Sequence, residues 1–509
     1  MKKKFQGLKR TAAFCAAIGI FTTALTGCNN NSSKVADDGK EHIKIFANFS
    51  SAEMGKGDPV IFEKIEEALN VKLDFIVPPS TNYKERLQIM LVSGDYPDLV
   101  LFPDVNDESY KNAIKNKVIL PLEKYIEKAP NIKDYTYDIS WKNIKNEDDG
   151  LIYGIPRTTV ARCDGFVVRA DWMKNVGIPV PEDNTMSITE FADMLEKFTF
   201  SDPDQNGKDD TFGFSGFVDS NKCMELLLKD QFNLLSWQEH SDEGYPYMDL
   251  IYSQNKDNYK RAMAYTQDLF KRKIIDPDSA VNNAANAADR FSSGICGVAK
   301  GFAAGVYGTD VVMREKFPDL ELTYLYVENE DNEVKGSYVT TGFWGFWSVM
   351  KSAKNPELAI SVLDYMLSDE GWDLILNGIE GVHYKVENNE RIYDKIVTID
   401  WGRYFVRRKD ALEFFVDKKT PASWLERTEK WLKMGVDAVV LSKGGDYKPK
   451  IALEPQFMET DMKLQETVAK ILTGYEEVSA YDDALDKWYK GGGEEYVKQM
   501  NDFIAKVEE

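Results

Sequence analysis

The sequence predicts an α/β protein with two large lobes and a helix-rich C-terminal part. Near the N-terminus, apolar residues follow the order β-α-β-α-β, which is typical of a doubly wound parallel sheet. The chain of 509 residues has room for two large lobes, since an average domain holds roughly 150 residues. Its 43% hydrophobic and 29% charged residues are ordinary for a soluble globular protein.

The first lobe begins with two alternating apolar runs at 42–46 and 71–77 and a short continuous apolar run at 99–102, all of which predict strands. A helix is expected from Asp58, a capping residue followed by Pro59 at the first helical position. A second helix is expected around 83–91. Ligands of such sheets bind at the carboxyl ends of the strands, here near 47–49 and 102–104.

From Gly150 onward, turn-rich segments alternate with shorter elements. We expect strands at 153–156, 167–169 and 297–299, an aromatic strand at 340–347, and helices at about 188–198, 257–272, 356–368, 424–442, 457–472, 480–489 and 494–507. The expected N-terminal lobe comprises 41–155 and about 293–345. The expected C-terminal lobe comprises about 156–292 and 346–509.

The first forty residues have the pattern of an export signal and a tether. The first ten contain five basic residues and no acidic one, and 11–26 are apolar or small. That apolar run is shorter than the about 20 residues of a membrane span. Leu25-Thr26-Gly27-Cys28 resembles a bacterial lipobox, so 1–27 would be a signal peptide and Cys28 would carry a lipid such as palmitate. Residues 28–40 would be a flexible tether, and the alternative is a plain signal peptide with a chance cysteine.

Charge and cysteine content limit the partners. The chain has 63 Lys and Arg against 84 Asp and Glu, a formal charge of -21, which argues against nucleic acid because a phosphate backbone needs a basic surface. Only 3 His are present, widely spaced, so zinc is disfavoured. Three cysteines remain after Cys15 and Cys28, at 163, 223 and 296. Their spacing leaves buried thiols and a disulfide both open.

A short acidic loop predicts a calcium site. Side-chain oxygens recur at alternate positions from Asp202, and Gly207 at the sixth position permits a sharp turn. The expected ligands are the side chains of Asp202, Asp204, Asn206 and Asp210 and the backbone carbonyl of Lys208. Gly213 stands where a related loop has its closing glutamate. The alternative is a polar turn, because Asp, Asn and Gly are common turn formers.

Sequence signatures of catalysis are missing. The chain has no GxSxG, no HExxH, no phosphate-binding loop and no GxGxxG that opens a helix. Paired carboxylates for glycoside hydrolysis stay open, since their separation cannot be read from a sequence. We therefore expect a binding protein rather than an enzyme.

Tryptophan and arginine residues near the expected crossing between lobes are candidate ligand contacts. Trp344 lies among glycines in a predicted strand, and Trp347, three residues on, would face the opposite way and pack in a core. Arg157 and Arg162 follow the first lobe. They would bind the carboxylate of an acidic sugar or form salt bridges with the acidic surface.

Six motifs occur in one order along the chain. They are the lipobox and the segments SGDYPD at 93–98, GLIYGIP at 150–156, RADW at 169–172, DPDQNG at 202–207 and GIEGVHY at 378–384. Together they resemble the extracellular solute-binding lipoproteins of carbohydrate ABC importers (family 1), in the Gram-positive branch similar to LplA and to alginate-binding proteins. The resemblance implies a type II periplasmic-binding-protein-like fold, whose lobes close on a saccharide, and a calcium ion at the loop from Asp202. That family often has a carboxylate after the position of Asp210, where this chain has Thr211.

These inferences combine into one expected function. A lipid-anchored monomer on the outer face of the cell membrane would capture an oligosaccharide and deliver it to an ABC permease. It would touch the membrane only through its anchor. The expected ligand contacts are Asn48, Asp104, Arg157, Arg162, Trp344 and Glu380. An exported glycan-active enzyme and a peptide-binding lipoprotein are the alternatives.

Overall fold

The structure is a computed structural model that describes residues 39–47, 58–78, 82–218, 226–240, 244–340, 342–387, 390–393, 402–409, 411–416, 420–445 and 447–508. Cys28, Asn48 and Cys223 lie outside the described residues. Residues 41–509 form one compact unit, which contains two five-stranded sheets. No helix in the described segments has the length and apolar character that crossing a membrane requires.

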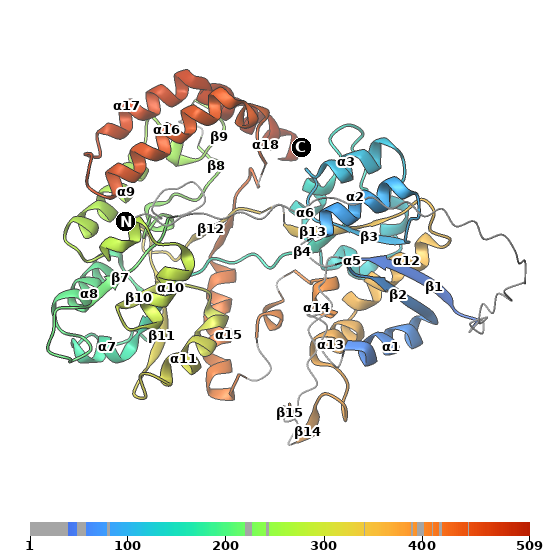
Figure 1. The fold of residues 1–509 in the computed structure, drawn as a ribbon, viewed down its shortest axis with the longest axis horizontal. Coiled ribbons are helices and arrows are strands. Elements are labelled where there is room, and N and C mark those ends of the chain that lie inside the picture. The colour runs from blue at the N-terminus through green and yellow to red at the C-terminus, as the bar shows by residue number, and fades with distance from the viewer. Residues whose placement is uncertain are drawn as a thin grey trace, which may run out of the picture. The chain divides into compact units, whose positions relative to one another are not determined.

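The first sheet confirms the β-α-β-α-β prediction (Figure 1). Its strands are β1 (Glu41–Phe46), β2 (Val71–Ile76), β3 (Leu99–Phe102), β4 (Ile155–Thr158) and β13 (Phe343–Val349), in the order β2-β1-β3-β13-β4. Helices α1 (Asp58–Leu69) and α2 (Tyr83–Ser93) make the connections between the parallel strands β1, β2 and β3. Strand β13 runs antiparallel to β3 and β4.

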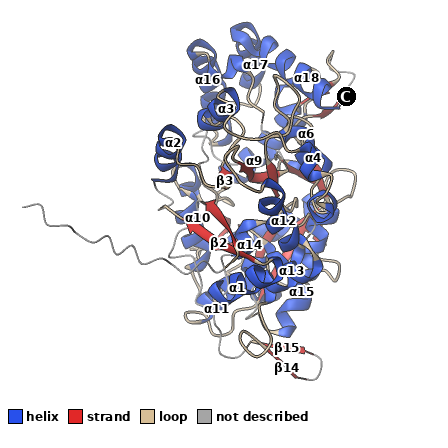
Figure 2. Cartoon of the chain, turned by 90° about the vertical axis from the view of Figure 1, so that its right-hand side faces the viewer, coloured by secondary structure: helices blue, strands red, loops and turns tan. Residues whose placement is uncertain are grey.

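Alternating side chains of this sheet pack into two separate cores. Leu99 and Leu101 belong to one core, and Val100 and Phe102 to the other, as the period of two in a strand requires. The first core is covered by α1, α12 (Pro356–Leu367), α13 (Asp369–Asn377) and α14 (Gly402–Phe405), which lie on one side in Figure 2. The second is covered by α2, α3 (Glu108–Lys115) and α6 (Asp138–Ile144). The short helices α4 (Glu123–Ile126) and α5 (Pro130–Asp134) complete this lobe.

The second sheet has the order β6-β11-β5-β10-β7. Its strands are β5 (Phe166–Arg169), β6 (Thr185–Met186), β7 (Phe212–Phe214), β10 (Cys296–Lys300) and β11 (Leu322–Val327). Strands β10 and β11 both run antiparallel to β5. The helices around it are α7 (Ala170–Asn175), α8 (Ile188–Phe200), α9 (Asn258–Lys271), α10 (Ala284–Ser292), α11 (Val306–Arg314), α15 (Ala422–Asp437), α16 (Pro455–Leu472), α17 (Ala480–Trp488) and α18 (Glu494–Glu508). Short two-stranded pairs are β8 (Gln238–Glu239) with β9 (Tyr247–Met248), β12 (Gly336–Tyr338) with β16 (Val439–Leu441), and β14 (Lys385–Glu387) with β15 (Glu390–Ile392).

The strand pairing corrects the expected lobe boundaries. Strands β10 and β11 pair in the second sheet, although 293–345 was assigned to the N-terminal lobe. Strand β13 pairs in the first sheet, and α12 to α14 pack in the core of that lobe, although 346–509 was assigned to the other. The chain therefore passes between lobes after β4, after β11 and after α14. Pairing across such long sequence separations leaves no local pattern in the sequence.

Cys163 and Cys296 are buried free thiols. Burial raises the pKa of each to about 12, so both stay protonated at neutral pH. The expectation of small buried thiols holds for these two residues.

Candidate functional site

Trp344 is an exposed aromatic side chain at the first lobe's edge where the chain crosses to the second. It lies at the start of β13 with 59% of its surface exposed, whereas Trp347 is 0% exposed. Trp347 therefore packs in the core, as expected, whereas Trp344 stays at the surface. Between them, Gly345 has a φ of +69°, and a Cβ there would meet the carbonyl oxygen of Phe102 at 2.8 Å. Glycine therefore lets β13 approach the end of β3 and the following Pro103 just after Trp344.

One arginine stacks on Trp344, and a second arginine interacts electrostatically with the first. The guanidinium carbon of Arg407, just after α14, lies 5.0 Å from the centre of the Trp344 ring, a cation–π distance. Arg157, on β4, and Arg407 are both buried. Burial, and next the repulsion from Arg407, lower the pKa of Arg157. Both groups remain cations at neutral pH because arginine does not deprotonate in proteins.

Arg162 forms a second group with aromatic rings of the crossing segments. Its guanidinium carbon lies 3.9 Å from the Phe302 ring centre and 4.7 Å from that of Phe415. Its Nε donates to Oδ1 of Asp164 at 3.0 Å. Phe302 follows β10 in the second lobe, and Phe415 precedes the crossing to α15. Arg162 thus lies close to two aromatic rings and is paired with a carboxylate.

The group around Trp344 and the group around Arg162 are linked by two segments of the chain. Arg157 and Arg162 are five residues apart on one crossing segment, which spans at most about 18 Å. Arg407 and Phe415 share another crossing segment. The crossing therefore contains both aromatic rings and guanidinium groups. Aromatic faces suit the CH faces of sugar rings, and guanidinium groups suit hydroxyl or carboxylate oxygens.

Sequence reasoning missed Arg407. Its only local signal was the pair Arg407-Arg408, and the two side chains behave differently. Arg408 stacks on Tyr135 at 3.8 Å and donates to the carbonyl of Leu367. Only the fold tells which of the two faces Trp344.

Asp104 follows Pro103, which Gly345 approaches, whereas Glu380 lies in a separate turn. Asp104 is exposed just after β3, and its Oδ1 accepts from the backbone N–H of Asn106 at 2.8 Å. Glu380 lies exposed in the turn after α13 and pairs with Tyr384 of the same turn. The described contacts therefore leave Glu380 without a link to Trp344.

The loop from Asp202 folds around one asparagine. The backbone N–H groups of Asn206 and Gly207 donate to Oδ1 and Oδ2 of Asp202 at 3.0 and 3.1 Å. The Asn206 side chain donates to Asp204 Oδ2 at 2.8 Å and to Asp210 Oδ1 at 3.0 Å. Burial, together with the neighbouring Asp202 and Asp210, raises the pKa of Asp204. This crowding of hard oxygen donors fits a Ca²⁺ ion in its chemistry.

This loop lies at the end of the second sheet away from Arg162. Asp204 and Gln205 line a cavity of about 860 Å³ together with Arg169 and Glu321. Arg169 ends β5 and Glu321 precedes β11, whereas the crossing reaches the opposite end of β5. Within the described segments, no cluster of three His, Cys, Asp or Glu side chains is arranged to hold a metal. Here the Asn206 amide separates the carboxylates.

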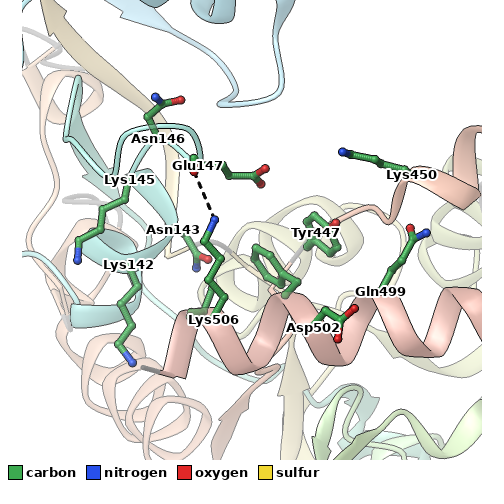
Figure 3. A pocket seen from close by; sticks show the side chains of 13 residues that line it. Lys142, Asn143, Lys145, Asn146, Glu147, Tyr447, Lys450, Gln499, Asp502 and Lys506 are labelled. Atoms are coloured by element: carbon green, nitrogen blue, oxygen red, sulfur yellow. Dashed lines mark hydrogen bonds between the residues drawn. The ribbon is translucent and has the colours of Figure 1, made fainter.

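A separate cavity of about 570 Å³ lies between the segment after α6 and helix α18. Lys506 Nζ donates to the carbonyl oxygen of Glu147 at 3.4 Å. Figure 3 shows Lys450 and Glu147 pointing toward each other, whereas Lys142 and Lys145 point away. The lysines around this cavity therefore do not converge on one anion.

A family model and the relatives of this chain agree on one protein family. The family model described as bacterial extracellular solute-binding protein matches residues 48–371. Lipoprotein LipO of Bacillus subtilis is 23% identical over 504 residues, covering 95% of this chain and 97% of that protein. The polygalacturonan/rhamnogalacturonan-binding protein YtcQ of the same organism is 23% identical over 462 residues, covering 87% and 88%.

Solved structures share the two-lobed fold. A solute-binding protein of Bifidobacterium longum infantis, described as HMO binding and ABC-transporter associated, superposes with a TM-score of 0.63 at 16% identity, covering 92% of this chain and 99% of that one. The alginate-binding protein AlgQ2 gives 0.58 at 18% identity, covering 91% and 98%. At such identities the likeness establishes the fold alone.

Proposed function

Because this chain belongs to the bacterial extracellular solute-binding protein family, we propose that it captures an oligosaccharide between its lobes and delivers it to an ABC permease. The observation that carries the proposal is the exposed face of Trp344 beside Arg407 at the crossing between lobes. The relative YtcQ, which covers 87% of this chain, is named a polygalacturonan/rhamnogalacturonan-binding protein. FusA of Streptococcus pneumoniae, which covers 45% of this chain, is named a fructooligosaccharide ABC transporter substrate-binding protein.

Binding would act by shifting a conformational equilibrium. A sugar ring would pack on Trp344. The oxygens of the sugar would accept hydrogen bonds from Arg157 and Arg162, and Asp104 would accept hydrogen bonds from sugar hydroxyls. A ligand that contacts both lobes favours the state in which they are closed. The permease would recognise that closed state, and no covalent step is needed.

The N-terminal segment would attach the protein to the cell membrane. Lipidation of Cys28 would anchor it to the outer face of the cell membrane, with residues 28–40 as a tether. The relative LipO, whose alignment covers 95% of this chain, is named a lipoprotein, which supports a lipid anchor. We expect a monomer whose partners are the saccharide and the permease.

A structural Ca²⁺ would complete the loop from Asp202. Side-chain oxygens of Asp202, Asp204, Asn206 and Asp210 and the carbonyl of Lys208 would hold it. The solved AlgQ2 is described as being without calcium ion, and one solved FusA as an EF-hand mutant. Because the loop is remote from Arg162, the ion would stabilise the second lobe rather than touch the ligand.

A thermal-shift screen tests the proposal. Residues 34–509, which contain the whole compact unit 41–509, are heated with calcium and with neutral oligosaccharides, uronate oligomers or peptides. A rise in Tm with a saccharide that is recovered intact supports the proposal. Recovery of a cleaved saccharide would indicate an enzyme, and a rise with peptides alone would indicate a peptide carrier.

A further inference from the structure

The cavity of about 860 Å³ in the second lobe lies at the end of the sheet that faces away from the crossing. Strand β5 ends on this cavity at Arg169, and Glu321 lines it just before β11 begins. Helix α7, the loop from Asp202 and the segment between α11 and β11 supply the rest of its wall. The saccharide site of the proposed function lies elsewhere and gives this cavity no role.

Two buried hydrogen-bond donors in the wall of this cavity have no acceptor. Arg169 and Trp172 both line the cavity and are 4% and 1% exposed. Nε and Nη2 of Arg169 donate to the carboxylate of Asp171 at 2.8 and 2.6 Å. Among the described residues, neither Nη1 of Arg169 nor Nε1 of Trp172 has a hydrogen-bond partner. A buried donor without a partner costs free energy, so each of the two calls for an acceptor from outside the chain.

The two donors belong to side chains that lie against each other. The guanidinium carbon of Arg169 is 4.7 Å from the ring centre of Trp172 and 5.0 Å from that of Phe317, which are cation–π distances. These rings and the carboxylate of Asp171 hold the guanidinium in place, but they leave Nη1 without an oxygen acceptor. One group with several acceptor oxygens, bound in this cavity, would meet the need of both donors.

Lysine side chains add further donors to the same wall. Lys316 donates from Nζ to the carbonyl oxygen of Ser293 at 2.9 Å, and Lys174 is exposed in the last turn of α7. Because Asp204 and Asp319 line the cavity as well, charge alone does not decide the ligand. The unpaired groups decide it, since guanidinium, indole and ammonium groups offer donors only and so suit a ligand group that offers acceptors only.

We propose that this cavity binds a small oxyanion, namely a phosphate, sulfate or carboxylate group, whose oxygens accept hydrogen bonds from Nη1 of Arg169 and Nε1 of Trp172. Lys174 and Lys316 border the same cavity and attract the anion to it. The inference goes beyond the proposed function and does not depend on it, because the crossing reaches the opposite end of β5.

The indole N–H signal of Trp172 in a nuclear magnetic resonance spectrum tests the site directly. The chain has 10 Trp, and the signal of Trp172 is identified by its loss in Trp172→Phe. Sulfate, phosphate and acetate are titrated separately into residues 34–509, with a chelator present so that no calcium ion binds the anion. With at least one of them, we expect the signal to move downfield, as an N–H does when it gains an acceptor. The shift should saturate with a Kd of about 10 mM or tighter.

Sodium chloride at equal ionic strength is the control, and it should give no saturating shift. A signal that stays in place with all three oxyanions would show that water suffices as the acceptor. An equal response to chloride would show that the effect is charge screening rather than binding. Either result would overturn the inference.

Two lysines of the second lobe supply matched variants. Lys174 and Lys197 are both exposed in the last turn of a helix, α7 and α8 respectively, but Lys197 borders a different cavity. At low salt, Lys174→Glu should weaken oxyanion binding by about fivefold or more, because it replaces attraction by repulsion. Lys197→Glu makes the same change of charge and should leave the Kd nearly unchanged. Equal losses in the two variants would contradict the location of the site.

Arg169→Lys removes Nη1 and keeps the positive charge, so it should abolish the saturating shift of the Trp172 signal. A shift that persists in this variant would remove Arg169 from the site. If Arg169→Lys does not fold, the two lysine variants decide the question, since both change exposed side chains.

Discussion

Arg407 and Trp344 lie 63 positions apart in the sequence, and the guanidinium carbon of one is 5.0 Å from the ring centre of the other. The contact joins the segment after α14 to the start of β13. It covers part of a tryptophan that stays 59% exposed, and the proposed ligand would pack on the exposed part. Binding and stability should therefore depend on different tryptophans of the same strand.

Trp344→Ala should weaken saccharide binding by about tenfold or more while changing Tm little, because the ring is largely exposed. Trp347→Ala is the matched contrast. Its ring is fully buried, and its Nε1 donates to the carbonyl of Phe405 at 2.7 Å, so its loss should cost about 3–5 kcal/mol of unfolding free energy. Titration calorimetry and thermal unfolding separate the two effects. Equal affinity in Trp344→Ala would remove this residue from the site.

Calcium should raise the Tm of the protein, and a chelator should reverse that rise. Asp204→Ala should abolish most of the rise, since it removes a carboxylate from the loop around Asn206. Asp209→Ala is the control, because it removes the same charge from an exposed neighbour that is not an expected ligand. A calcium-dependent rise that survives Asp204→Ala would argue against the site.

The chelated protein should show a pH effect at the same residue. The pKa of Asp204 is raised by burial and by the carboxylates around it, so its ionised form destabilises the metal-free fold. Stability linked to this group is therefore present below the ordinary pKa of an aspartate and lost as pH rises through the raised value.

In chelator at neutral pH, Asp204→Asn should accordingly unfold at the same or a higher temperature than the unchanged protein. That advantage should vanish on acidification, when Asp204 itself becomes neutral. Thermal scans between about pH 4 and 7 check this. An advantage of Asp204→Asn that grows on acidification would contradict the sign.

Cys163 and Cys296 should resist alkylation in the native protein. Both thiols are buried, with pKa values raised to about 12, and the thiolate is the reactive form. Peptide mapping after iodoacetamide should find both unmodified until denaturant is added. Modification of Cys296 in the native state would show that the second sheet opens at β10.

The sequence by itself determined the local elements of this protein. The alternation and capping patterns placed β1, α1, β2, α2 and β3 in order, and the glycines near Trp344 marked it as the exposed one of the two tryptophans in β13. The acidic loop at 202–210 was also visible, because its expected ligands are neighbours in the chain. Such features depend on contacts within a few residues.

Tertiary structure alone decided which distant segments meet. It placed β10 and β11 in one sheet and β13 in the other, against the expected lobe boundaries. It also selected Arg407 over Arg408 as the partner of Trp344 and left Glu380 without a link to that group. These outcomes depend on packing between segments far apart in sequence, where burial and pairing energies are set by the partner surface and not by the local order of residues.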